Sequence, residues 1–228
     1  MSRDTYGRWP WASAALLVPA SAAAVRRRDW LAADGRWVAG LALPVLLAHQ
    51  TEEWVRPGGF LPFANQRLLG SDAPTFPLTE RLGFWINVPV GWGTAAGGML
   101  LWSRTPAVAA AVLGTELGNV AMHCGMAIRE RRYNPGVATA VALFLPHTVA
   151  GAGWLVRSRR AGGRTLGAAA IGAASGLVLP QLLKRRGGQF HQIELMYHPA
   201  TWPPRPHLAG TRRRRSCGWP GTRCAGAC

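Results

Sequence analysis

Apolar residues in this sequence are gathered into blocks of roughly 20 residues, with short arginine-rich segments between them. A helix needs about 20 apolar residues to cross a bilayer. Hydrophobic residues make up 49% of the chain and charged residues only 16%. We therefore expect an all-α fold, a polytopic transmembrane helical bundle of about five or six spans. The expected spans are residues 9–25, which form the weakest, and 37–55, 82–102, 106–128, 135–156 and 165–183.

The blocks divide the chain into three parts. Residues 1–36 form an N-terminal extension, whose apolar run is either a weak first span, interrupted by prolines, or a signal-like segment. Residues 37–183 form the bundle. Residues 184–228 begin with three basic residues and are rich in Pro, Arg and Gly, so we expect a disordered basic tail.

Local features refine the bundle. Pro44 is expected to kink the second span, because proline removes one backbone hydrogen bond and clashes with the preceding turn. Residues 56–81 contain too few apolar residues to span, and we interpret them as an interfacial or re-entrant piece that covers a site. Glycines four residues apart, at Gly114 and Gly118 and again at Gly172 and Gly176, favour close helix packing.

The formal net charge is +16. Positive loops normally accompany membrane spans, and they can contact anionic lipid headgroups, so membrane lipids are the expected partners. Nucleic-acid binding is not expected, because the sequence shows no folded soluble domain with a basic face. The four cysteines are too few and too scattered for a disulfide scaffold.

The second block ends in the sequence His49-Gln50-Thr51-Glu52-Glu53. The spacing i, i+3 and i+4 puts the histidine and both carboxylates on one side of a helix. A charged group at bilayer depth costs ~2.5–3.5 kcal/mol on insertion scales, so such groups usually face the bundle interior and serve a function.

Other blocks also carry polar residues. Counting about 1.5 Å per residue from one membrane face puts all of them in the same half of the bilayer as the five-residue motif. We therefore predict an internal polar site built by spans two to five. Its members on the other spans are Asn87, Glu116, Asn119, His123 and His147.

Histidine and carboxylate together suit Fe, Mn or Zn, which predicts a divalent metal site. A bound metal could activate water for hydrolysis or handle oxygen, so we expect a metal-dependent hydrolase or oxidoreductase. The depth of the site favours an apolar or lipid-like small-molecule substrate. The expected catalytic residues are His49, Glu52, Glu53 and His123; the expected metal ligands are His49, Glu53, Glu116, His123 and His147, with Asn87 and Asn119 as supporting polar groups.

Three alternatives stay open. A histidine beside carboxylates can act as a general acid and base without a metal. Intramembrane Glu and His residues also serve proton relays, which would suit a proton- or ion-coupled transporter. Finally, the polar residues could only hold the helices together by hydrogen bonds, in a protein that is not an enzyme.

The stretch from His49 to Trp54 resembles the signature of the HXXEE family of bacterial membrane proteins. Residues 57–60, the pair Asn119 and His123, and residues 133–136 are similar to that family's pattern as well. The resemblance covers roughly residues 37–160. It implies a multi-pass integral protein, expected in the bacterial inner (plasma) membrane, of unknown function and with motif residues that suggest an enzyme.

Overall fold

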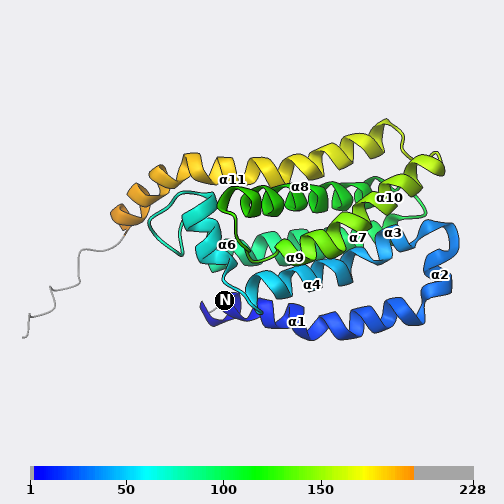
Figure 1. Cartoon of the computed structure of the whole chain (residues 1–228), viewed down its shortest axis with the longest axis horizontal. Helices are drawn as coiled ribbons and strands as arrows, with labels where there is room; N and C mark the ends of the chain where they lie inside the picture. Colours follow the sequence, from blue (N-terminus) through cyan, green and yellow to red (C-terminus); the bar gives the residue numbers. More distant parts are fainter. Residues whose placement is uncertain (1–2, 198–228) are drawn as a thin grey trace, which may run out of the picture.

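The computed structural model describes residues 3–197, and every regular element in that range is helical (Figure 1). The all-α prediction is confirmed. The α-helices are α1 (Arg3–Arg26), α2 (Arg28–Ala32), α3 (Trp37–Gly40), α4 (Ala42–Trp54), α5 (Phe60–Phe63), α6 (Glu80–Trp85), α7 (Gly93–Leu101), α8 (Ala107–Glu130), α9 (Val137–Thr139), α10 (Leu145–Arg157) and α11 (Gly163–Tyr197). Joining them are a 3-10 turn, η1 (Ala33–Gly35), and π-helical segments η2 (Ala64–Leu68), η3 (Ile86–Trp92) and η4 (Ala140–Phe144).

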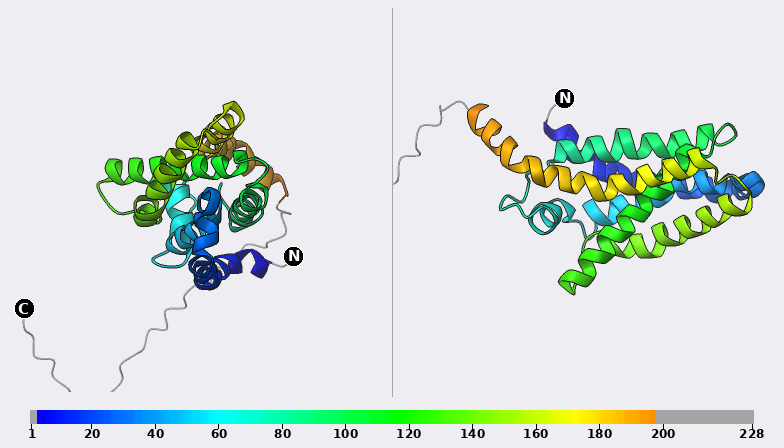
Figure 2. Two further views of the ribbon diagram at one scale, coloured as in Figure 1. Left: turned by 90° about the vertical axis from the view of Figure 1, so that its right-hand side faces the viewer. Right: turned by 90° about the horizontal axis from the view of Figure 1, so that it is seen from above.

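The long rods of the bundle lie side by side, and several consist of more than one element (Figures 1 and 2). Helix α8 packs against α7, α10, η4 and α11, while α1 packs against α4 and α6. In Figure 1, α1 and α11 form opposite sides of the bundle. The predicted site residues on α4, α8 and α10 are buried: His49, Glu52, Glu53, Glu116, His123 and His147.

Proline explains part of this segmentation. Helices α3 and α4 are separated at Leu41, three residues before Pro44, as expected where a proline cannot bond the preceding turn. Pro89 lies inside the π-helical segment η3. By contrast, Pro10 and Pro19 lie inside α1, which continues through both. The two prolines therefore do not break the helix, contrary to the interruption expected for the first apolar run. Packing of α1 along α4 offsets the backbone hydrogen bonds that the prolines remove.

The connection between α4 and α6 is folded. Its aliphatic side chains, with Leu61 and Leu78 among them, form a small apolar core. Asn65 is fully buried beneath it, donating to the Pro74 and Leu78 carbonyls and accepting from the Leu78 amide. The Asn65 side chain therefore supplies hydrogen-bond partners to three backbone groups of the connection. These bonds help to hold the connection over the end of α4.

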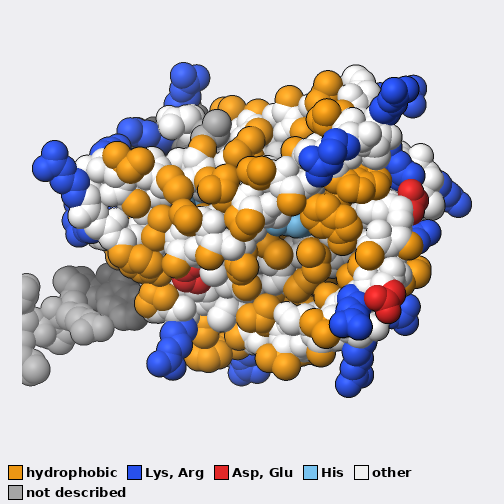
Figure 3. Space-filling model, turned by 45° about the vertical axis from the view of Figure 1, so that its right-hand side comes forward, with side chains coloured by type: hydrophobic (Ala, Val, Ile, Leu, Met, Phe, Trp, Pro, Cys, Tyr) orange, Lys and Arg blue, Asp and Glu red, His pale blue; other side chains and the backbone are white. Residues whose placement is uncertain are grey.

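Apolar side chains cover much of the surface shown in Figure 3, and the basic side chains lie mainly toward its edges. Within the described range, the segments Ala107–Glu130 and Val137–Arg157 are long and apolar enough to cross a membrane. These two are judged by length and composition alone. The larger number of spans expected from the sequence stays a prediction.

The expected tail boundary at residue 184 does not coincide with a change in the structure, because α11 continues to Tyr197. Residues 181–197 contain no proline, so no backbone restriction ends the helix there. The rest of the expected tail, residues 198–228, lies outside the described residues.

Helices α8 and α11 approach each other through small residues. A Cβ built on Gly114 would lie 2.0 Å from the Ala169 carbonyl oxygen, and one on Gly172 would lie 2.0 Å from the Ala111 carbonyl oxygen. Only hydrogen fits at these two positions. The close packing expected from the glycine spacing is therefore present at Gly114 and Gly172.

We predict that Gly114→Ala destabilises the protein by about 1–3 kcal/mol, because the new methyl group would force the two backbones apart. Gly125→Ala is the matched control on the same helix, where a Cβ would meet nothing within 4 Å. The control should be neutral or slightly stabilising, since alanine favours helix. Unfolding of the detergent-purified variants, followed by circular dichroism, measures the difference. Equal stability of both variants would contradict the packing described here.

Candidate metal centre

Three buried side chains from two helices converge beside the end of α4. His49 and Glu53 lie one turn apart on α4, with 3.3 Å between His49 Nε2 and Glu53 Oε1. His123, on α8, places its Nε2 3.2 Å from the same Glu53 oxygen. Ligand atoms of the three residues all lie within 4.8 Å of one another. We call His49, Glu53 and His123 the His–Glu cluster.

The His49 ring is oriented by Thr139. Its Nδ1 lies 2.9 Å from Thr139 Oγ1. The Thr139 hydroxyl in turn donates to the Glu52 carboxylate. A hydroxyl has one hydrogen, and Thr139 donates it to Glu52, so Thr139 Oγ1 must accept a hydrogen bond from His49 Nδ1–H. In a neutral imidazole that carries its hydrogen on Nδ1, Nε2 has a free lone pair. That Nε2 is buried and has no hydrogen-bond partner among the described residues, because its approach to Glu53 lacks hydrogen-bond geometry.

The His123 ring is oriented in the same way by Asn134. Its Nδ1 lies 2.8 Å from Asn134 Oδ1, and Asn134 Nδ2 donates to the His123 carbonyl oxygen at 2.9 Å. The second bond fixes which end of the amide faces the ring. Nδ1 of His123 therefore donates, and its Nε2 faces Glu53 with a lone pair when the ring is neutral.

The chemistry of the cluster follows from these assignments. Two imidazole nitrogens and one carboxylate, all without a proton of their own, aim at one small volume. Such a set needs a cation, either a proton or a metal ion, to offset its electron pairs. Two histidines and one carboxylate are a known divalent-metal ligand set, and outer hydrogen bonds to Nδ1 orient such ligands. The cluster could hold a divalent metal ion.

Aromatic side chains and one glycine enclose the cluster. The Phe144 ring centroid lies 4.2 Å from that of His49, and the Phe60 centroid lies 5.9 Å from that of His123. Gly136 has a φ of 101°, and a Cβ there would lie 2.5 Å from His123 Cε1 and 2.9 Å from Glu53 Cγ. The loop backbone at Gly136 therefore forms one wall, and the surroundings are largely apolar.

Glu52 has a different role from its neighbour. One of its oxygens accepts from the Tyr133 hydroxyl at 2.7 Å and from the Ala138 amide at 3.1 Å, and the other accepts from the Thr139 amide at 2.7 Å. Burial and the Glu52 carboxylate raise the pKa of the Tyr133 hydroxyl, which therefore stays protonated and donates. Glu52 thus satisfies free amides at the N-terminus of α9, where a carboxylate is favoured. The structure makes it a positioning residue in place of the expected catalytic one.

Glu116 and His147, expected as further metal ligands, do not join the cluster. His147 Nδ1 lies 2.8 Å from Glu116 Oε2, so the two residues pair with each other. Counting depth along each span placed them deeper than His49 but in the same half of the bilayer, and such a count carries no information on which way a side chain points.

The supporting amides also bond elsewhere. Asn119 donates to the Thr115 carbonyl of its own helix. Asn87 accepts from Gln50 Nε2 at 3.0 Å, and Gln50 Oε1 accepts from Ser13 and Trp92. Gln50 of the motif therefore ties α1 and η3 to α4, a role that its sequence context did not reveal.

Sequence reasoning also missed the two residues that orient the imidazoles. Asn134 lies in the stretch 133–136 that resembles the HXXEE pattern, so a signal was present for it. Thr139 offered none, because a threonine in an apolar run usually packs or bonds its own helix.

We predict that Glu52→Gln lowers stability by about 1–3 kcal/mol, because the amide nitrogen would face backbone donors and leave at least one unsatisfied. Glu80→Gln is the matched control, since Glu80 is an exposed first-turn glutamate of α6. Thermal unfolding of both variants measures the effect. The positioning role of Glu52 is wrong if the two variants unfold at the same temperature.

Comparison with known proteins adds one finding to this geometry. Residues 40–150 match the family model described as a protein of unknown function with HXXEE motif. That range contains the whole His–Glu cluster and Glu52. The curated proteins and the solved structures give no match. Residues 40–150 are therefore similar to the HXXEE-motif family.

Proposed function

We propose that this protein is a multi-pass membrane enzyme whose His–Glu cluster binds one divalent metal ion and acts on an apolar or lipid-like substrate. One observation carries the proposal. Nε2 of His49 and Nε2 of His123 both face the Glu53 carboxylate, while both Nδ1 atoms are occupied as donors. A purely structural contact would not need two imidazoles oriented by separate partners toward one carboxylate.

The ligand chemistry limits the metal to a few candidates. Imidazole and carboxylate together suit Fe, Mn or Zn. When bound, such an ion supplies an activated water or, if it is iron, a place for oxygen to react. The protein's own part is to fix the ligands. Asn134 and Thr139 hold the rings, and Phe60 and Phe144 exclude water from them.

The membrane part of the proposal starts from Ala107–Glu130 and Val137–Arg157, the two segments that are long and apolar enough to cross a bilayer. Three rods pack against these segments: α3 with α4, α6 with η3 and α7, and α11. The rod formed by α1 packs against α4 and α6, and together the rods complete a bundle of about six spans. Large apolar side chains on these rods face outward, as lipid contact requires; among them are Val18, Trp85, Leu100 and Ile171. The bacterial inner membrane is the proposed location. A cluster buried in such a bundle favours a substrate that enters from the lipid.

We predict that detergent-purified protein carries about one equivalent of Fe, Mn or Zn, since the cluster offers one set of three ligands. His49→Ala, Glu53→Gln and His123→Ala should each lose it. Elemental analysis of the purified variants measures the content.

His147→Gln is the matched control, because it changes a buried histidine that lies outside the cluster. It should keep the metal. Folded wild-type protein that carries no metal, and takes up none when it is supplied, would refute the proposed metal enzyme and leave a metal-free acid–base site as the better explanation.

We predict that Asn134→Leu weakens metal affinity by about 10–100-fold, because His123 loses the acceptor that orients its ring. Asn119→Leu on α8 removes an amide whose hydrogen bond, within the part of the chain that the structure describes, goes to the Thr115 carbonyl of its own helix, and it should leave the affinity unchanged. Metal titration of the stripped variants measures both. Equal affinities would show that Asn134 does not position the ligand.

A further inference from the structure

Glu116 and His147 form a second buried polar group, which the proposed metal chemistry does not use. Glu116 lies on α8 and His147 on α10, and both are almost completely buried. His147 Nδ1 lies 2.8 Å from Glu116 Oε2 and 3.0 Å from Oε1. Its Nε2 lies 3.1 Å from the Val38 carbonyl oxygen on α3. The pair therefore links three helices.

Counting donors and acceptors fixes the proton content of this pair. The Val38 carbonyl can only accept, so His147 Nε2 carries a hydrogen. In a neutral ring, Nδ1 is then a lone pair. A lone pair at 2.8 Å from a bare carboxylate would be repulsive, so one further proton must lie between Nδ1 and Glu116. Whether that proton sits on nitrogen or on oxygen, the pair as a whole is neutral.

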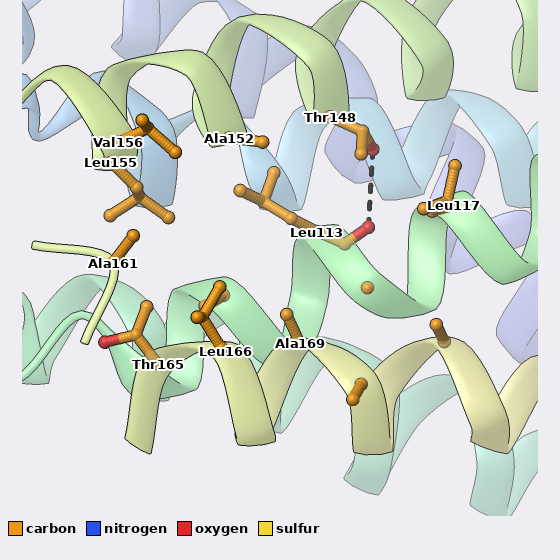
Figure 4. A pocket seen from close by; sticks show the side chains of 14 residues that line it. Leu113, Leu117, Thr148, Ala152, Leu155, Val156, Ala161, Thr165, Leu166 and Ala169 are labelled. Carbon is orange, nitrogen blue, oxygen red and sulfur yellow. Dashed lines mark hydrogen bonds between the residues drawn. The ribbon is translucent and has the colours of Figure 1, made fainter. Parts of the chain in front are cut away.

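The surroundings favour this neutral state. Thr148 donates to Glu116 Oε2 at 3.2 Å and also lines a cavity of about 270 Å³ between α8, α10 and α11. Figure 4 shows its hydroxyl directed toward the Leu113 carbonyl, among aliphatic and small side chains. A net charge beside such an apolar cavity would be strongly disfavoured.

Few other titratable groups act on the pair. From α4, the titratable side chain whose charge would act on Glu116, if it were protonated, is His49. Helix α3 contributes the Val38 carbonyl and the Trp37 ring, whose centroid lies 6.3 Å from that of His147. The part of α11 that lines the cavity presents Thr165 and apolar residues.

We propose that Glu116 and His147 form a proton-binding site, separate from the His–Glu cluster, that holds one exchangeable proton inside the bundle. The site takes up a proton to become neutral and releases it to leave one net negative charge. Its ligand is the proton alone, and no other reactant is needed. Thr148 is a positioning residue that holds the carboxylate toward the imidazole.

Two spectroscopic measurements on the full-length, detergent-purified protein test this site. Infrared spectra of wild type against Glu116→Gln report whether the Glu116 carboxyl is protonated. The ¹⁵N signals of His147, assigned by comparison with His147→Gln, report which ring nitrogens carry hydrogen. The titration should run well to either side of the ordinary pKa values of ~4.3 for glutamate and ~6.5 for histidine.

At neutral pH the pair should hold one proton beyond the Nε2 hydrogen, seen as a protonated carboxyl or as a doubly protonated ring. That proton should be lost at alkaline pH and regained when the pH is lowered. Asn119→Leu is the matched control on α8, because the Asn119 side chain donates to the Thr115 carbonyl and lies outside the pair, and it should retain the signal.

Two outcomes overturn the proposal. One is an ionised carboxyl facing an unprotonated Nδ1 at neutral pH. The other is a signal that does not change with pH, which would show a permanent structural bond. The ¹⁵N measurement on wild type needs no change at Glu116, so the test stands even if Glu116→Gln fails to fold. Neither measurement depends on metal binding, so failure here and failure of the proposed enzyme are separable.

Discussion

A buried carboxylate needs positive partners, and the interior of this protein is arranged around that need at Glu53. Removing a carboxylate from water costs several kcal/mol unless nearby charge and hydrogen bonds offset the loss. Glu53 faces two imidazoles, His49 and His123, which α4 and α8 bring together and which complete a ligand set for a shared proton or metal ion. Thr139 orients the His49 ring and Asn134 orients the His123 ring. The cluster therefore forms only when the segments that carry these residues are correctly positioned against α4 and α8.

Glu52 and Glu53 are adjacent in the sequence but bind different partners. Adjacent residues on a helix point about 100° apart, so their carboxylates face different neighbours. Glu53 faces the cluster, and Glu52 binds the start of α9. The two are connected through Thr139, whose hydroxyl donates to Glu52 and accepts from His49. Placement of the loop before α9 therefore sets the orientation of a cluster residue.

The two polar groups of the bundle are kept apart by helix geometry. Along α8, Glu116 and His123 lie two turns apart, which is about 10 Å. His123 meets α4, whereas Glu116 meets α10. Residues seven apart lie on nearly the same face of a helix, so it is the separation along α8 that gives the two residues different partners. Close packing of α8 and α11 at Gly114 and Gly172 supports this arrangement, since it leaves α8 fixed against a long neighbour.

The sequence by itself determined the helical rods, because blocks of apolar residues and their interruptions are local properties of the chain. It also indicated that His49, Glu53 and His123 belong together, since depth along a helix can be counted from residue number. Only the tertiary structure decided which way each side chain points, because rotation about a helix axis depends on its neighbours. That is why Glu116 and His147 form their own pair, why Glu52 caps a helix, and why Asn134 and Thr139 orient the imidazoles.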